Sequence, residues 1–251
     1  MSLVAFSDLR MATYCPRKLY YARREPKREP PARVDSVRDL AQRYPDLLAA
    51  SDDELKAEPI ELETPVYRAR LSRTRDRLAN RDDEEATTDA GSNTPQSDRD
   101  GDQSVVTQNR WRDLCAPTAT EVLVTGRECR GIVHKILTDP LEPVLVSAGR
   151  PPDRGVWKPQ RVHAVAAAKA LAWEHQRSVG GAWLEYPAYG EIRHVPMTTR
   201  RKAEYRRALR TVAEIDGPPP RISNREKCSA CVYADTCGVR TRSLRSLLGF
   251  G

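Results

Sequence analysis

The chain has 251 residues and a formal net charge of +7 at pH 7. This length suffices for one sizeable core, or for one domain with an appendage. No run approaches the roughly eighteen apolar residues of a membrane span, and the first residues show no basic segment followed by an apolar one. We therefore expect no membrane anchor and no secretory signal. The expected compartment is a reducing cytoplasm, where clustered cysteines bind metal more often than they form disulfides.

The charge is unevenly distributed along the chain. Residues 76–104 carry nine acids and three arginines, a net charge of −6, which leaves +13 on the remainder. A strongly basic body favours a partner with a phosphate backbone over the alternative, a merely solvated basic surface. Within the acidic segment, residues 82–103 are rich in Gly, Ser, Thr and Asn and contain no aromatic residue. This composition predicts a disordered insertion without a catalytic role.

The N-terminal part is predicted to be mostly helical. Ser7 offers a side-chain acceptor for a first helix, and Pro16 is suited to open a second one. Residues 34–56 also show a helical pattern, which Pro45 is expected to divide. Residues 59–71 are predicted to be more strand-like.

The second half predicts an α/β arrangement. Three apolar, β-branched runs, with a turn at Asp139-Pro140, are typical of neighbouring strands of a half-buried sheet: residues 122–125, 131–137 and 143–149. An alanine-rich helix over 159–176 should pack closely on this sheet. A hairpin over 182–197 follows, and Thr198 or Thr199 caps a last helix.

Two basic regions are candidates for nucleic-acid contact. The last helix carries six cations outside its predicted core face, and six like charges on one helix favour an anionic partner. Near the N-terminus, basic residues are interleaved with tyrosines, a pattern that suits single-stranded nucleic acid because bases stack on aromatic rings. For each tyrosine the alternative is a place in the core. The predicted contact residues are Arg17, Lys18, Arg200, Arg201 and Arg207.

The cysteines define the most specific pattern in the chain. Three of them lie within ten residues in a C-x2-C-x5-C spacing, namely Cys228, Cys231 and Cys237. A metal or cluster shared with Cys15 would join the two ends of the chain. Four thiolates suit an iron–sulfur cluster, and they also suit a structural zinc ion. Cys115 and Cys129 lack partner spacing and are expected to be ordinary thiols.

These motifs resemble one known family. The matching residues are Phe6-Ser-Asp-Leu9 with Tyr14-Cys15-Pro16-Arg17-Lys18-Leu19-Tyr20-Tyr21, Lys227-Cys228-Ser-Ala-Cys231 with Cys237, and, in the middle of the chain, Gly131-Ile-Val-His134 with Gln160. In these residues, and in its order helix, strands, helix, strands, the chain resembles the CRISPR-associated "Cas-four" exonucleases and the related nuclease domain of the "Dna-two" helicase–nucleases. The resemblance covers most of the chain except roughly residues 34–115.

The resemblance implies a fold, a cofactor and partners. The fold would be a single PD-(D/E)XK nuclease-like domain over residues 1–251, with a central mixed sheet flanked by helices. A module formed by residue 15 and residues 227–238 would hold a 4Fe–4S cluster through Cys15, Cys228, Cys231 and Cys237. The residues themselves leave zinc, or no metal, as alternatives. The implied partners are DNA, mainly single-stranded, and proteins of CRISPR adaptation in antiviral defence.

The chain departs from this family at the catalytic positions. The family uses an aspartate in Gly-x-x-Asp, then Glu-x-Lys on the next strand, then Gln-x-x-x-Tyr on the following helix. Two carboxylates hold the magnesium or manganese ion that activates water, and the lysine stabilises charge at the phosphate. In this chain the five positions are occupied by His134, Ser147, Gly149, Gln160 and Ala164. One neutral imidazole cannot replace two carboxylates for a hard cation, so we expect a nuclease fold that has lost its nuclease site.

Two other functions remain as alternatives. The first is an active manganese- or magnesium-dependent exonuclease acting on single-stranded DNA. Its carboxylate and lysine would have migrated to other charged residues, although we expect each of these to be exposed to solvent: Glu128, Glu142, Asp153, Lys135 and Lys158. The second alternative is a zinc-clasped protein-interaction module.

Overall fold

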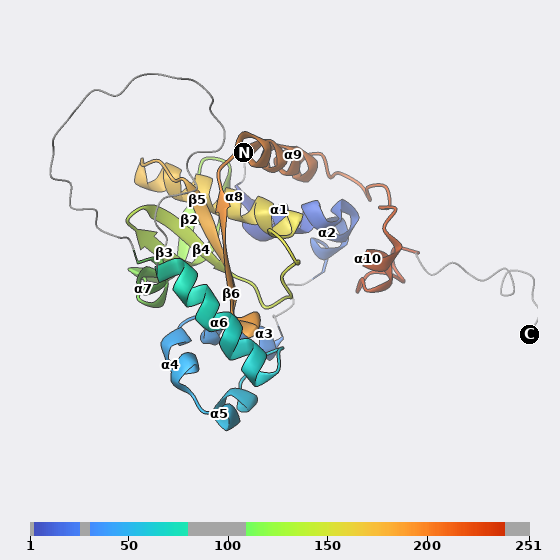
Figure 1. Ribbon diagram of the computed structural model, residues 1–251. Coiled ribbons are helices and arrows are strands. Elements are labelled where there is room, and N and C mark those ends of the chain that lie inside the picture. Colours follow the sequence, from blue (N-terminus) through green and yellow to red (C-terminus); the bar gives the residue numbers. More distant parts are fainter. Residues whose placement is uncertain (1–2, 26–30, 80–108, 239–251) are drawn as a thin grey trace, which may run out of the picture.

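The computed structural model describes residues 3–25, 31–79 and 109–238, and shows an α/β protein with helices on both faces of a mixed six-stranded sheet (Figure 1). The first half contains β1 (Val4–Ala5), α1 (Phe6–Tyr14), α2 (Pro16–Ala22), α3 (Ala32–Leu40), α4 (Tyr44–Ala49), α5 (Asp52–Ala57) and α6 (Thr64–Ala79). The second half contains α7 (Arg110–Cys115), β2 (Ala119–Thr125), β3 (Cys129–Thr138), β4 (Leu141–Val146), α8 (Lys158–His175), β5 (Gly181–Tyr186), the 3-10 helix η1 (Pro187–Tyr189), β6 (Glu191–Pro196), α9 (Thr199–Ala213) and α10 (Arg225–Ser229).

The sheet has the order β1-β3-β4-β5-β6, and β2, which is not part of this order, also pairs with β3. Strands β2, β3 and β4 form an antiparallel meander, whereas β4 and β5 are parallel and are connected through α8. Strands β5 and β6 form the expected hairpin, in which Gly190 has a φ of +60°, a conformation that favours glycine. The strands predicted in the second half of the chain and the alanine-rich helix are thus confirmed, within a few residues at their ends.

Each face of the sheet has its own core. Helices α1, α8 and α9 cover one face, where Ala164 and Ala166–Ala168 of α8 are completely buried. Because α8 has small side chains there, it approaches the sheet so closely that a Cβ on Gly126 would lie 2.7 Å from the Cα of Ala170. Helices α4 to α7 contribute to the core on the opposite face, which includes Tyr44, Tyr67 and Trp183.

Several local expectations for the helices are confirmed. Residues 34–56 form three short helices, and Pro45 lies in the first turn of α4. Thr198 caps α9 by accepting a hydrogen bond from the amide of Arg201. Among the described residues, no helix combines the length and the apolar character that a membrane crossing requires.

Two local predictions were wrong. Residues 64–71 are not strand-like but begin the long helix α6, because Tyr67, Leu71, Thr74 and Leu78 recur at helical spacing and are all buried. Helix α1 begins at Phe6 rather than after Ser7, and its N-cap residue Ala5 makes no side-chain cap. Of the predicted acidic insertion, residues 76–79 end α6, and residues 80–104 lie outside the described part of the chain.

Candidate functional site

The two ends of the described chain meet at one small pocket beside α2. Cys15 separates α1 from α2, and Pro16 opens the second helix directly after it. Helix α10 and the turns that follow it supply the other thiols. The pocket is lined by all four cysteines that the sequence singled out, namely Cys15, Cys228, Cys231 and Cys237. Each of them is half-buried.

Aromatic and polar contacts hold the C-terminal cysteine segment against α2. Tyr21 of α2 stacks on Tyr233 with ring centroids 5.7 Å apart, and Tyr233 donates a hydrogen bond to the Glu25 carboxylate at 3.1 Å. Arg17 donates to the carbonyl oxygen of Pro219 at 3.0 Å. Tyr14, Tyr21 and Arg17 therefore line the cysteine pocket, although the sequence pattern suggested that they contact nucleic acid.

The surroundings of the pocket are basic. Lys18 and Lys227 lie over the ring of Tyr14, at 5.3 and 4.7 Å from its centroid. The pKa of Tyr14 is raised, first by burial and then by the nearby thiols of Cys231, Cys15 and Cys228.

The donor set is suited to a thiolate-ligated group. In residues 3–25, 31–79 and 109–238, no three His, Cys, Asp or Glu side chains converge closely enough to hold a single metal ion. The four thiols surround the pocket instead. All four line one pocket, and cysteine thiolates are the ligands both of iron–sulfur clusters and of structural zinc ions.

The positions of the family's catalytic residues lie where β4 ends and α8 begins. Val146, the last residue of β4, donates its amide to His134 Nδ1 at 3.1 Å. Gln160, in the first turn of α8, donates to Ser147 Oγ at 2.8 Å. The amide of Gly149 also donates to Ser147 Oγ, at 3.3 Å. Ser147, Gly149 and Gln160 therefore form one hydrogen-bonded group without a carboxylate, and His134 contacts the backbone of the neighbouring residue, Val146.

His134 is not arranged as a metal ligand. Because Nδ1 accepts the amide of Val146, the neutral ring carries its proton on Nε2, and neither nitrogen offers a free lone pair. Burial, together with the nearby charges of Arg38 and Arg10, lowers the pKa of His134 to about 4. The ring is therefore neutral near pH 7 and presents a hydrogen-bond donor.

Tyr186 supplies a hydroxyl that the sequence did not single out. It lies at the end of β5 and donates to Gln160 Oε1 at 2.6 Å, which fixes the amide that in turn holds Ser147. Ala164, at the position where the family has its helical tyrosine, is completely buried in the core. A tyrosine from a strand thus contacts the glutamine in this chain.

Two of the charged residues expected to be exposed are buried. Glu142 is buried on β4, where it accepts hydrogen bonds from Trp183 Nε1 at 2.6 Å and from His194 Nε2 at 2.9 Å. Lys135 is completely buried and forms an ion pair with Glu185. Burial is tolerated because each charge has polar partners.

Glu142 alternates along β4 with Leu141 and Leu145, which belong to the α1–α8 core. It therefore lies on the opposite face of the sheet from that core. The other three residues, Glu128, Asp153 and Lys158, are exposed as expected.

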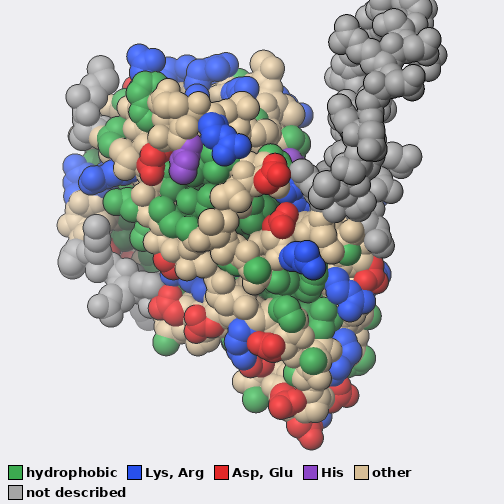
Figure 2. All heavy atoms as spheres, turned by 90° about the vertical axis from the view of Figure 1, so that its left-hand side faces the viewer, with side chains coloured by type: hydrophobic (Ala, Val, Ile, Leu, Met, Phe, Trp, Pro, Cys, Tyr) green, Lys and Arg blue, Asp and Glu red, His purple; other side chains and the backbone are tan. Residues whose placement is uncertain are grey.

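The predicted nucleic-acid residues on α9 lie at the surface. The Arg200 side chain is 88% exposed and Arg207 is exposed, whereas Arg201 is half-buried and donates to the carbonyl oxygen of Pro196 at 2.8 Å. Lys and Arg side chains gather along the upper edge of Figure 2, at the height of α9 in Figure 1.

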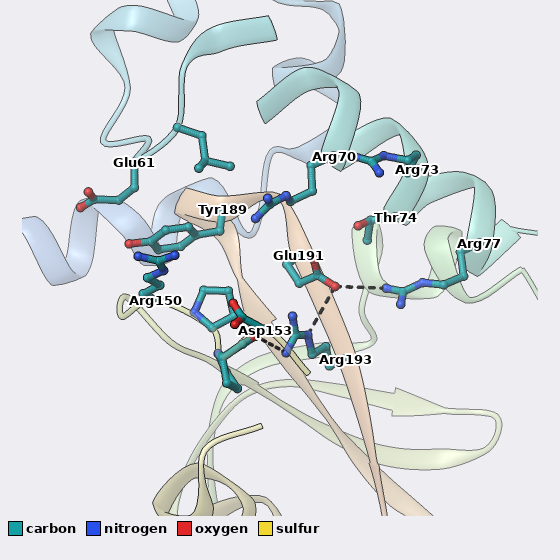
Figure 3. A pocket seen from close by; sticks show the side chains of 13 residues that line it. Glu61, Arg70, Arg73, Thr74, Arg77, Arg150, Asp153, Tyr189, Glu191 and Arg193 are labelled. Atoms are coloured by element: carbon teal, nitrogen blue, oxygen red, sulfur yellow. Dashed lines mark hydrogen bonds and ion pairs between the residues drawn. The ribbon is translucent and has the colours of Figure 1, made fainter. Parts of the chain in front are cut away.

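A second basic feature was missed from the sequence. A cavity of about 680 Å³ opens between α6 and the β5–β6 hairpin (Figure 3). Three arginines of α6 line it: Arg70, Arg73 and Arg77. Their spacing along one helix face is visible in the sequence, but residues 59–71, which include Arg70, were predicted to be strand-like.

No family model matches the chain, and no curated protein matches it.

Proposed function

We propose that this chain is an iron–sulfur, DNA-binding protein of the Cas-four/Dna-two nuclease-like family, with a PD-(D/E)XK core whose metal-dependent cleavage site has been lost. It would act in DNA processing or in CRISPR adaptation. The observation that carries this proposal is the shared pocket of Cys15, Cys228, Cys231 and Cys237, whose members come from opposite ends of the chain. The order of α1, the β2–β4 meander, α8 and β5–β6 supports it, since it agrees with the order on which the resemblance rests.

The loss of cleavage is proposed from the chemistry of the former metal site. A hard divalent cation requires oxygen ligands, mostly carboxylates. His134, Ser147 and Gln160 present an imidazole, a hydroxyl and an amide that are already hydrogen-bonded to one another or to the backbone. Glu142, the buried carboxylate among the migrated candidates, is held by Trp183 and His194.

DNA binding is proposed from charge. Helix α9 presents exposed cations that include Arg200, Arg206, Arg207 and Arg210, and of these Arg200 has an acidic partner within the described chain, Glu204 at 3.9 Å. Such a surface neutralises phosphates and releases counterions on binding, which makes affinity fall steeply with salt.

One experiment tests cofactor, binding and catalysis together. The full chain, purified without oxygen, is incubated with labelled single- and double-stranded DNA, with and without manganese. We expect a coloured protein that binds DNA with a steep salt dependence and leaves it uncut. Manganese-dependent cleavage that disappears in Glu142→Ala or Lys158→Ala would establish the exonuclease instead. One zinc per chain, no colour and weak binding would indicate the interaction module.

A further inference from the structure

The cavity beside α6 has an uneven distribution of charge. We call it the arginine cleft; its charged lining residues are Arg70, Arg73, Arg77, Arg150 and Arg193, with Glu61, Asp153 and Glu191. The arginines come from both sides, with Arg70 and Arg77 of α6 on one wall and Arg150 and Arg193 on the other, whereas Arg73 lies along its own helix (Figure 3). Five cations against three acids leave the cleft net positive.

Part of this charge is already used by the protein itself. Arg77 and Arg193 both approach Glu191 Oε1, at 3.8 and 3.4 Å. Each also donates to a backbone carbonyl, Arg77 to Ile192 at 2.6 Å and Arg193 to Pro152 at 2.7 Å. These two guanidinium groups are therefore fixed in the floor of the cleft.

The other three arginines have no acidic partner within residues 3–25, 31–79 and 109–238. Arg73 donates only to Ala69 of its own helix, at 3.3 Å. The side chains of Arg70 and Arg150 make no hydrogen bond or ion pair within those ranges. Like charges that face each other across a cleft repel, so an anion between them lowers the free energy of this arrangement.

The arginines of α6 form a row rather than a single point. Positions 70, 73 and 77 share one face of the helix, and at the helical rise they extend over about 10 Å. Neighbouring phosphates of a nucleic-acid strand lie much closer than that, so such a row can follow more than one of them. At the other wall Tyr189 is half-buried, and Arg150 lies beside its ring (Figure 3). An aromatic ring next to a row of cations suits single-stranded DNA, because a base stacks while the backbone is neutralised.

We propose that the arginine cleft binds single-stranded DNA, with phosphates on Arg70 and Arg73 and a base against Tyr189. The proposal rests on the DNA-binding function proposed above. It adds α6 to α9 as a surface that contacts the bound strand. A small phosphate compound is less suited to the cleft, since the cations do not converge on one position.

The test uses the full chain and a labelled oligothymidylate, with binding followed by fluorescence anisotropy at several salt concentrations. The variant is Arg70→Glu with Arg73→Glu. The matched control is Arg75→Glu with Arg112→Glu, which makes the same charge change. Both residues lie outside the cleft, since neither lines the cavity, and Arg75 pairs with Asp76. We expect the cleft variant to bind at least about tenfold more weakly with a salt slope lower by about two. The control should stay within about threefold of the unchanged chain.

A second substitution tests the aromatic contact. Tyr189→Leu should weaken binding to a similar degree but leave the salt slope unchanged, because a stacked base contributes no counterion release. Circular dichroism checks the fold of each variant. If the double variant does not fold, Arg150→Glu, in an exposed loop, makes the same test.

The outcomes separate the cleft from the wider proposal. Equal DNA binding by the unchanged chain and by the cleft variant overturns the cleft and leaves the proposed function standing. Equal weakening by the cleft and control variants also overturns it, since the effect would then be one of net charge. If the unchanged chain binds no DNA at any salt concentration, the proposed function fails together with the cleft.

Discussion

Lys135 and Glu185 form an ion pair with Nζ and Oε1 3.0 Å apart, and both side chains are completely buried. The pair joins β3 to β5 on the face opposite α8. Lys135 Nζ also donates to the carbonyl oxygens of Ala41 at 2.6 Å and Leu114 at 2.8 Å. The ammonium group thus connects the sheet to Ala41, directly after α3, and to Leu114 in α7.

We expect Lys135→Met to lower the free energy of unfolding by about 3–5 kcal/mol, because Glu185 would remain buried without its partner. Urea unfolding measures this change. The double variant Lys135→Met with Glu185→Leu serves as control and should recover part of the loss, since no unpaired charge remains. A single variant within about 1 kcal/mol of the unchanged chain would show that the pair does not hold these elements together.

The pH dependence of stability follows from His134. Burial lowers its pKa from 6.5 to about 4 in the folded chain, so between those values the unfolded state binds a proton that the folded state does not. Stability should therefore fall as pH decreases through this window, by up to about 3 kcal/mol from this residue. Burial lowers the pKa of His163 in the same direction.

The comparison that isolates His134 is with His134→Asn, whose side-chain oxygen can still accept the Val146 amide. At pH 7 we expect the unchanged chain to be the more stable of the two in urea unfolding. Its advantage should shrink towards pH 4, because the asparagine does not titrate. A difference that stays constant with pH would contradict the burial of a neutral imidazole at this position.

Glu142 is expected to act in stability rather than in catalysis. Its carboxylate holds Trp183 and His194 in place, so Glu142→Gln should cost about 1–3 kcal/mol in unfolding free energy and change the tryptophan fluorescence. DNA binding should be unaffected. The opposite pattern, unchanged stability with altered metal-dependent activity on DNA, would indicate that this carboxylate has a catalytic role.

The elements with a clear local signal were predictable from the sequence. Thr198 caps α9 and Pro16 opens α2, because each satisfies a requirement of its own helix terminus. The β2–β4 meander followed from β-branched runs bounded by turns. The C-x2-C-x5-C spacing singled out three of the four thiols that line the cysteine pocket, and Cys15 was the fourth candidate, from the other end of the chain.

Features that depend on distant partners were not predictable in this way. Lys135 is buried because Glu185, Ala41 and Leu114 meet it in space, and none of these is near it in sequence. Tyr186 contacts Gln160 only because β5 is placed next to β4. The arginine row of α6 was missed for a different reason, since the strand-like prediction for residues 59–71 covered the first half of the helix that carries it.

The account depends most on one inorganic centre shared by the two ends of the chain. Its most direct test is the iron and acid-labile sulfide content of the chain purified without oxygen, together with its visible absorption. We predict about four of each per chain, lost in Cys15→Ser but kept in Cys115→Ser, whose thiol lies outside the pocket. Protein without iron and sulfide, or a Cys15→Ser variant that retains both, would contradict it.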